Sequence, residues 1–430
     1  MYDIVTVFNL MAEESQNLSE ILFKPKFVYK ETSTISNGGC PLPRIIKQDK
    51  SFGFSKNFYR PLLRYEWVLS GGNALDIDEA LSNISVAKGH RTRECFDTVE
   101  EYGPGNWIYE FSSIAQKRVN LAHENEANRE YDKASHNYRM ASRYFAIASY
   151  PNLKGDTLAL QADTLSRSTY KQMFKVDNSL GIIKEETFKV DSKDVKGYLH
   201  LPSYNGVFPC VICVCNYEFG PTSFFRMYNN FFKKEKIAIF VVDLPGTGEC
   251  EKLTLSEHLS AVTESAIDHV KKLNNVDSSK IVLLGSRLAA TSCLRASVLK
   301  RDDIKALCVV FPYIHSVFTD ASLLKSFPLC LRSSLCNRLN LDASSWDTVI
   351  PQLKALSLKE QGLIGAGAKC YFDTYVGFAR NSVVSKQDEL LLSMTFEHLQ
   401  IDEYENGVAD ITDKIMFDRI CQFLKKQLCE

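Results

Sequence analysis

A turn between a predicted strand and a predicted helix carries the most specific chemical signal in the sequence. Residues 281–290 read Ile-Val-Leu-Leu-Gly-Ser-Arg-Leu-Ala-Ala, an apolar strand that runs directly into helix-forming residues. This layout is typical of a nucleophile elbow, a sharp turn that needs small residues two positions before and two positions after the nucleophile. Gly285 and Ala289 meet that requirement around Arg287. The nucleophile position therefore holds an arginine, which stays protonated and cannot attack a carbonyl carbon.

Ser286, one residue earlier, is the alternative nucleophile. Centring the turn on Ser286 would place Leu284 and Leu288 where small residues are required. It would also point the serine away from the cleft at the strand end. The sequence therefore favours an elbow centred on Arg287, with Ser286 as the less favoured candidate.

The partners of a catalytic serine would be an acid after one of the next-to-last strands and a histidine after the last strand. The acid position falls in the loop 377–382, which offers Asn381 rather than a carboxylate. Residues 402–410, beyond the last predicted strand, contain no histidine. His398 lies within that strand, where a packed or edge position is the usual interpretation. A Ser-His-Asp triad cannot be read from this sequence.

Polar residues that follow neighbouring predicted strands define a candidate pocket around Arg287. Asn216 and Glu218 follow one strand, and His315 follows another. If Glu218 faces Arg287, the arginine either binds a small carboxylate or phosphate through its planar guanidinium or forms a plain ion pair that locks the elbow. Both interpretations stay open. His315 either lines the pocket or is a hydrogen-bonded residue without a chemical role.

Alternating strands and helices after about residue 175 must position these residues. The predicted strands are 195–201, 208–215, 236–242, 280–285, 305–311, 369–375 and 392–399, and the predicted helices are 254–273, 287–300, 351–363 and 413–428. Thr254 and Glu257 have the spacing of a capping box at the start of the first of these helices. Such alternation predicts an α/β domain, with a mainly parallel sheet covered by helices on both faces and ligands bound at the carboxyl ends of the strands.

Residues 1–175 have a different composition, which predicts an extended arm followed by a helical domain. Pro25 and a neighbouring Thr/Ser-rich stretch disfavour regular structure in the arm. Residues 107–150 have helix-forming composition, and Asp156 precedes apolar residues at helical spacing. The sequence thus divides into 1–175, an arm plus helical domain, and 176–430, the α/β domain.

Two further features have structural interpretations. Trp107 and Tyr109 are expected to pin the helical domain to the sheet domain, with a hydrogen-bond partner for the indole at that seam. Asp243 and the glycines at 246 and 248 form a turn that lacks the Gly-Lys-Ser/Thr ending of a phosphate-binding loop. We therefore interpret it as a tight turn.

The composition excludes several classes of protein. The chain has 430 residues, 45% of them hydrophobic and 24% charged, with 51 Lys+Arg against 52 Asp+Glu. This length is sufficient for two or three domains with large cores. The formal net charge of -1 argues against a nucleic-acid partner, since such binding depends on clustered cations.

The cysteines and the hydropathy pattern indicate the compartment. The 13 cysteines are an odd number and lie singly in apolar runs, where cysteine behaves as a small hydrophobic residue. Their spacing does not fit zinc ligands, so we expect no metal site. We find no signal-peptide pattern and no apolar run of the ~20 residues that a spanning helix needs. The expected location is the reducing cytoplasm, with no membrane partner.

Several stretches spread over nearly the whole chain resemble one known family. They are Asn17–Pro25, Glu31–Thr34, Gly105–Glu110, Tyr150–Asp156 and Leu356–Leu363. These stretches are similar to those of the fermentation-respiration switch protein (FrsA) family of gamma-proteobacteria. The resemblance implies an α/β-hydrolase fold with an N-terminal helical extension and a small helical cap around residues 320–365.

The resemblance also implies an activity and partners. Members of the family are described as esterases, and some as partners of the glucose-specific IIA component of the sugar phosphotransferase system. A cofactor-independent decarboxylase activity has been proposed for the family and disputed. The resemblance therefore implies a small carboxylic ester as ligand, whereas Arg287 suits an anionic metabolite. We expect no cofactor.

The elbow arginine belongs to this resemblance, whereas other positions depart from it. The family motif looks like Gly-Phe-Arg-Phe-Gly and stands here as Gly285-Ser286-Arg287-Leu288-Ala289. Asn216-Tyr217-Glu218 replaces a Gly-Leu-Asp turn, and Asn381-Ser382 replaces an Asp-Pro pair at the acid position. Two functions stay open: a weak carboxylic-ester hydrolase, or a catalytically silent binding or regulatory protein on a hydrolase scaffold.

Overall fold

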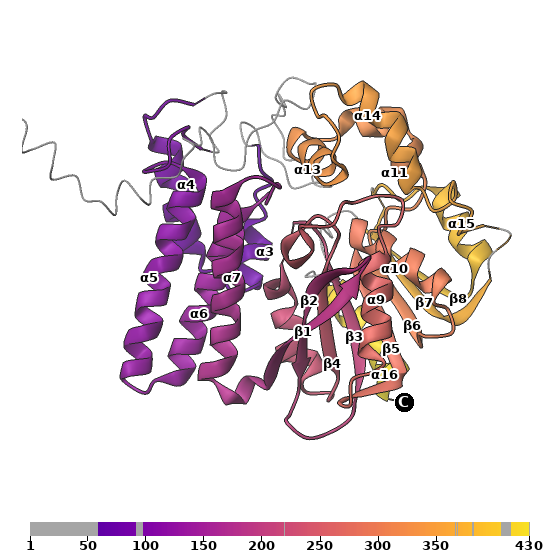
Figure 1. Ribbon diagram of the computed structural model, residues 1–430, viewed down its shortest axis with the longest axis horizontal. Coiled ribbons are helices and arrows are strands. Elements are labelled where there is room, and N and C mark those ends of the chain that lie inside the picture. Colours follow the sequence, from indigo (N-terminus) through magenta and orange to yellow (C-terminus); the bar gives the residue numbers. More distant parts are fainter. Residues whose placement is uncertain are drawn as a thin grey trace, which may run out of the picture.

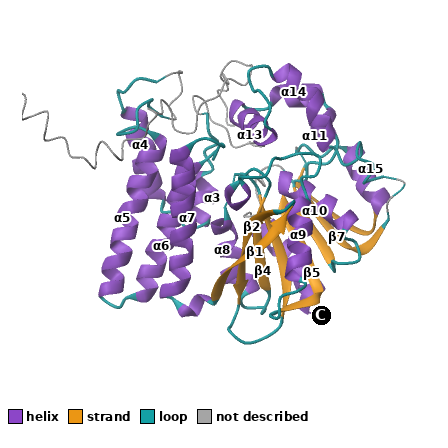
Figure 2. Ribbon diagram, viewed as in Figure 1, coloured by secondary structure: helices purple, strands orange, loops and turns teal. Residues whose placement is uncertain are grey.

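The computed structural model describes residues 59–91, 98–218, 220–365, 367, 369–380, 382–405 and 414–429. The expected N-terminal arm, the acid position Asn381 and most of the segment between the last strand and the last helix lie outside these residues. In the described part, a layer of long helices stands beside a sheet that is covered by helices on both faces (Figures 1 and 2).

The helical layer contains three long helices that run side by side (Figure 1). Its elements are α3 (Arg64–Leu69), α4 (Ala74–Val86), α5 (Trp107–Ala127), α6 (Tyr131–Ser149) and α7 (Thr157–Val176). The predicted start of α7 is confirmed, because the Asp156 side chain accepts a hydrogen bond from the backbone N–H of Ala159 at 2.9 Å. Such a cap satisfies one of the free N–H groups of the first turn.

The expectation for Trp107 and Tyr109 was wrong. The Trp107 indole N–H donates to the backbone oxygen of Ile147 in α6 at 2.8 Å, and its ring is buried among residues of α3 to α7. Tyr109 packs edge-on against Tyr102, with ring centroids 5.5 Å apart. Trp107 therefore stabilises the helical layer from inside, Tyr109 packs at its surface, and neither of these contacts joins the layer to the sheet.

An eight-stranded, mostly parallel sheet forms the second layer and confirms the predicted α/β class. Its order is β1-β2-β4-β3-β5-β6-β7-β8. The strands are β1 (Ile182–Val190), β2 (Lys193–Leu201), β3 (Phe208–Cys215), β4 (Ala238–Asp243), β5 (Val276–Ser286), β6 (Ala306–Val310), β7 (Cys370–Ala379) and β8 (Phe396–Tyr404). β1 and β2 are antiparallel to their neighbours, and the other pairs are parallel. The carboxyl ends of β3 to β8 therefore lie along the same edge.

Helices cover both faces of this sheet, so successive residues of the central strands enter different cores. They are α8 (Phe225–Met227), α9 (Ala261–Val270), α10 (Leu288–Leu299), α15 (Lys386–Thr395) and α16 (Lys414–Cys429). Ile212 packs in the core that contains α9, α10 and α15, and its neighbours Val211 and Cys213 pack in the core that contains α7 and α16. The helical layer thus reaches the sheet through α7.

A group of short helices between β6 and β7 lies beyond one end of the sheet (Figure 1). They are α11 (Ser316–Thr319), α12 (Ala321–Ser326), α13 (Leu329–Leu339) and α14 (Trp346–Leu353). We refer to residues 316–356 as the cap. α13 carries the residues that contact the helical layer and the loop after β4.

Three boundaries predicted from the sequence were wrong. The helix expected over 254–273 begins at Ala261, so Thr254 and Glu257 do not form a capping box. The helix expected over 351–363 is α14, which ends at Leu353 and is followed by one short 3-10 turn. The strand expected over 392–399 begins at Phe396, because a capping box of Ser385 and Asp388 starts a helix that continues to Thr395.

Candidate functional site

The turn after β5 has the steric form of an elbow centred on Arg287. Arg287 has φ 52° and ψ -121°, a backbone conformation that residues with a side chain rarely adopt and that concentrates at functional turns. A Cβ atom on Gly285 would meet the backbone oxygen of Ala289 and Sγ of Cys293, each at 2.8 Å. Ser286 is still part of β5, paired with Val310 of β6. The spacing of small residues thus reflects a real contact between strand and helix.

Arg287 and Glu218 meet across the ends of β5 and β3. Their side chains form an ion pair between Nη1 and Oε2 and are 12% and 10% exposed. Asn216 Nδ2 donates to the same Glu218 oxygen at 3.1 Å. The structure therefore brings Asn216, Glu218 and Arg287 together.

Two buried tyrosines surround this pair. Burial raises the pKa of Tyr217, and the negative charge of Glu218 raises it further. Burial also raises the pKa of Tyr313, with Arg287 opposing that shift. Both phenols therefore stay protonated. Within the described residues, the Tyr217 hydroxyl and Asn216 Oδ1 are buried and have no hydrogen-bond partner.

His315 makes its polar contacts elsewhere. Its Nδ1 lies 2.8 Å from the Ser357 hydroxyl, and its backbone N–H donates to Asp388 at 3.0 Å. Burial lowers the pKa of the imidazole, and Lys359 lowers it further. His315 thus joins the start of the cap to α15, and none of these contacts involves Glu218 or Arg287. His398 is exposed on the edge strand β8.

A second charged cluster links the helical layer to the sheet, and sequence analysis missed it. Arg167 on α7 lies 2.7 Å from Asp163 and 2.8 Å from Asp243, which ends β4. The spacing of Asp163 and Arg167 on one helix was visible in the sequence, but their approach to Asp243 depends on how two layers pack. Burial raises the pKa of Asp243, Arg167 opposes the shift, and Asp163 adds to it. A Cβ atom on Gly248 (φ 50°) would overlap Arg167, so the tight turn predicted here leaves space for that side chain.

Arg338 on α13 brings the cap to the same place. It is 1% exposed, and its guanidinium donates to the Thr247 hydroxyl at 3.0 Å and to the backbone oxygens of Pro151 and Ser334 at 2.9 Å and 3.1 Å. Its Cζ lies 5.0 Å from the centre of the Tyr217 ring. Burial lowers the pKa of this arginine. Arg338 therefore ties the cap to the helical layer and to the loop after β4.

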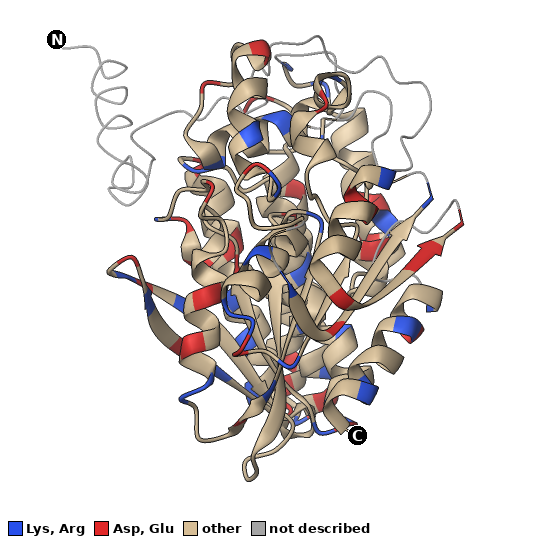
Figure 3. Ribbon diagram, turned by 90° about the vertical axis from the view of Figure 1, so that its right-hand side faces the viewer, with Lys and Arg blue, Asp and Glu red and all other residues tan. Residues whose placement is uncertain are grey.

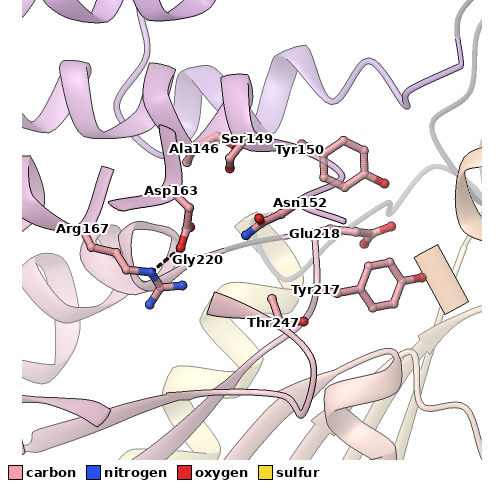
Figure 4. A pocket seen from close by; sticks show the side chains of 10 residues that line it. All are labelled: Ala146, Ser149, Tyr150, Asn152, Asp163, Arg167, Tyr217, Glu218, Gly220 and Thr247. Carbon is pink, nitrogen blue, oxygen red and sulfur yellow. Dashed lines mark hydrogen bonds and ion pairs between the residues drawn. The ribbon is translucent and has the colours of Figure 1, made fainter. Parts of the chain in front are cut away.

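A small pocket opens where these segments meet (Figure 4). Its lining residues are Ala146, Ser149, Tyr150, Asn152, Asp163, Arg167, Tyr217, Glu218, Gly220 and Thr247. They come from α6, α7, the turn between those helices and the loops after β3 and β4. We call this space the seam pocket.

Basic and acidic residues are interspersed along the described elements (Figure 3). Within the described ranges, the structure contains no group of three or more His, Cys, Asp or Glu side chains that could hold a metal ion. The helices described include none with both the length and the apolar character to cross a bilayer.

Comparisons with known proteins identify the family. The family model described as "Esterase FrsA-like" matches residues 13–429. Esterase FrsA of Klebsiella pneumoniae (strain 342) is 29% identical over 378 residues, 87% of this chain and 89% of the relative. Esterase FrsA of Yersinia pestis (strain Pestoides F) is 30% identical over 382 residues, 87% of this chain and 90% of the relative.

Solved structures show the same fold at lower identity. The 2,6-dihydroxy-pseudo-oxynicotine hydrolase matches with a TM-score of 0.67 at 17% identity, over 84% of this chain and 95% of that chain. Wild-type AbyA5 matches with a TM-score of 0.63 at 15% identity, over 84% and 93%. The family model spans nearly the whole chain, and the predicted family and fold are confirmed: this chain belongs to the FrsA-like esterase family and has the α/β-hydrolase fold.

Proposed function

We propose that this chain is a binding or regulatory member of its esterase family and does not hydrolyse esters through a serine nucleophile. The observation that carries the proposal is the ion pair of Arg287 and Glu218 at the elbow. The position where the fold presents a nucleophile holds a cation already engaged by a carboxylate. An arginine in such a place recognises anions well, because its planar donors match a carboxylate or a phosphate.

The ligand of this site would be a small anionic metabolite or the carboxyl end of a small ester. Such a group can take the place of Glu218 on Arg287, since both present the same pair of oxygens. The buried Tyr217 hydroxyl, which has no hydrogen-bond partner within the described part of the chain, would then donate to the ligand. The Asn216 Nδ2 group, which now donates to Glu218, would be released to donate to it as well. As a protein partner we propose the glucose-specific IIA component that the family resemblance implies.

Ester hydrolysis is the second candidate function. The relatives are named esterases. The close contact between Gly285 and Ala289 preserves the tight strand-to-helix turn of the elbow. Backbone N–H groups after Arg287 and near Asn216 would then stabilise an oxyanion. Catalysis from such a hole alone is small compared with a complete triad.

Short p-nitrophenyl esters separate the two functions. We expect wild type, Arg287→Ala and the surface control Arg380→Ala to release p-nitrophenol no faster than the ester hydrolyses in buffer without protein. A wild-type rate well above buffer that Arg287→Ala abolishes and Arg380→Ala retains would contradict the proposal. For the protein partner, immobilised wild type should retain purified IIA component in a pull-down, and no retention contradicts that partner.

A further inference from the structure

A buried cluster where α7 meets the end of β4 holds more negative than positive charge. Arg167 on α7 contacts two carboxylates: its Nε donates to Asp163 Oδ2 at 2.7 Å, and its Nη1 lies 2.8 Å from Asp243 Oδ2. The side chains of Arg167, Asp163 and Asp243 are 7%, 11% and 3% exposed. One cation therefore faces two buried anions, and a buried net charge is costly unless a counter-charge or a proton compensates it.

Asp243 is the less well satisfied of the two carboxylates. Its Oδ2 accepts a hydrogen bond from the backbone N–H of Glu249 at 3.0 Å, but its Oδ1 is buried and has no hydrogen-bond partner among the described residues. Arg167 Nη1 likewise has no hydrogen-bond partner there, so its contact with Asp243 is one of charge alone. Burial without donors favours the neutral form of a carboxyl group. A proton that reaches the cluster is therefore expected on Asp243.

The other titratable groups around Asp243 do not offset the second carboxylate. Tyr198 on β2 donates its hydroxyl to Glu249 at 2.5 Å, and burial raises the pKa of Tyr198. The phenol therefore stays neutral, while Glu249 adds a further negative charge. Burial also raises the pKa of the thiols of Cys215 on β3 and Cys250 in the loop after β4, so both stay protonated.

The neighbouring cations have other partners. Lys171, one turn further along α7, pairs with Glu185 at 2.7 Å. Arg338 donates to the Thr247 hydroxyl and to backbone oxygens of the cap and of the turn before α7. The excess negative charge thus remains at the cluster, and burial raises the pKa of Asp243.

We propose that Asp243 is a proton-operated switch in the contact between α7 and the sheet. When Asp243 carries a proton, Arg167 and Asp163 form a balanced pair and the contact is tight. When the proton leaves, the second buried anion has no cation of its own, and the contact loosens as water reaches the carboxylate.

The switch lies where the helical layer, the sheet and the cap meet. Thr247, four residues after Asp243, is held by Arg338 of the cap. Thr247 and Asp163 also line the seam pocket, which Figure 4 shows between these segments. The switch goes beyond the proposed function and does not depend on a ligand at Arg287, which is not part of the cluster.

The charge balance fixes the direction of the pH dependence. In the unfolded chain Asp243 is solvated and loses its proton near the ordinary pKa of about 3.9. In the folded protein the pKa of Asp243 is raised by burial, so the proton stays bound to higher pH. The folded chain therefore binds more protons in this interval, and the contact weakens as pH rises through the folded-state pKa.

Hydrogen–deuterium exchange of α7 tests the switch. Protection factors of the amides of residues 162–170 are measured between pH 4.5 and pH 8, with α10 as the internal reference. For wild type we expect the protection of α7 to fall about five- to tenfold relative to α10, because a pKa displaced by one unit corresponds to a factor of ten. Asp163→Asn and Asp243→Asn each leave Arg167 with one carboxylate and should abolish this fall.

The control is Asp268→Asn, on the half-exposed pair of α9 with Lys300, which should keep the pH dependence of wild type. Two results would overturn the switch: protection of α7 in wild type that does not change with pH relative to α10, or an undiminished fall in Asp163→Asn or Asp243→Asn. Because each of these two variants restores the charge balance by itself, either one decides if the other fails to fold.

Discussion

Arg287 occupies the backbone conformation that the α/β-hydrolase elbow gives to its nucleophile. Its positive φ places the guanidinium at the strand ends, where Glu218 meets it. The two side chains are nearly buried, so each charge depends on the other for compensation. At the scale of residues, the elbow has become the site of an ion pair.

A double-mutant cycle tests how strongly this pair is coupled. Glu218→Leu should lower the free energy of unfolding by about 3–5 kcal/mol, because the charge of Arg287 loses its compensating carboxylate. The double variant Glu218→Leu/Arg287→Leu should be more stable than Glu218→Leu alone, since it removes both charges. Urea unfolding of wild type, Glu218→Leu, Arg287→Leu and the double variant completes the cycle.

The exposed pair of Glu79 and Lys117 in the helical layer is the control for this cycle. Glu79→Leu is expected to change the free energy of unfolding by about 1 kcal/mol or less. Simple additivity of the two substitutions at Glu218 and Arg287 would show that the pair is not coupled.

At the scale of elements, α7 joins the helical layer to the sheet through aromatic contacts around one buried histidine. His200 on β2 is fully buried, and its Nε2 lies 3.0 Å from the Tyr170 hydroxyl. Its Nδ1 lies 3.2 Å from the backbone oxygen of Tyr198. Burial lowers the pKa of His200 to about 3, and two backbone hydrogen bonds oppose that shift. The imidazole is therefore neutral in the folded protein.

Protonation of His200 should make this contact sensitive to acid. Because the folded-state pKa is depressed, the unfolded chain binds the proton first as pH falls below about 6.5, and stability is lost down to about pH 3. We expect wild type to lose up to about 1.4 kcal/mol per pH unit in that window relative to His200→Gln, which stays neutral. Unfolding free energies measured at several pH values give the two slopes.

His398 on the exposed edge strand supplies the matched control for this experiment. His398→Gln should keep the pH dependence of wild type. If the curves of wild type and His200→Gln run parallel below pH 6.5, His200 does not carry the acid sensitivity.

The element boundaries show where the spacing of apolar residues predicts a strand or helix correctly and where it does not. β3 matched its predicted range because every second residue faces a different buried core, which selects a continuous apolar run. β1 was missed because it is an edge strand whose first part is only partly buried and carries three consecutive charged residues, Lys184, Glu185 and Glu186, so the alternation typical of a strand is absent there. The helix before β8 was missed because Leu391 and Leu392 suit a buried strand as well as a helix.

At the scale of the whole molecule, Arg338 connects the cap, the helical layer and the loop after β4. The neighbouring Asn337 adds two hydrogen bonds to the backbone of Lys154, at 2.8 Å and 3.2 Å. Cys330, on the same helix, is fully buried and faces the Tyr150 hydroxyl at 3.5 Å. Access to Cys330 therefore reports on whether α13 stays in place.

Arg338→Met should loosen the cap without unfolding the sheet. We expect alkylation of Cys330 by iodoacetamide to accelerate at least about tenfold relative to wild type, because several hydrogen bonds to a charged group are lost. Peptide mass mapping gives this rate together with that of Cys308, which lies in β6 and should stay protected.

Arg118, whose ion pair with Asp76 lies in the helical layer, provides the comparison for Arg338. Arg118→Met should leave the alkylation of Cys330 unchanged. Equal acceleration at Cys330 and Cys308 in Arg338→Met would indicate global unfolding, and no acceleration at either would reject the role of Arg338.

The sequence by itself determined the fold class, the family and the elbow around Arg287. These properties depend on local chemistry: buried strands need apolar runs, and the strand-to-helix turn needs small residues at Gly285 and Ala289. The proximity of Glu218 to Arg287 was also predictable, because parallel strands end at one edge of the sheet.

Only the tertiary structure decided which distant side chains share a site. The cluster of Asp163, Arg167 and Asp243 and the anchor at Arg338 join segments from different layers. Their contacts depend on the angle and depth at which the helical layer and the cap pack on the sheet. Residue spacing along the chain does not encode that geometry, so the seam pocket emerged only from the folded molecule.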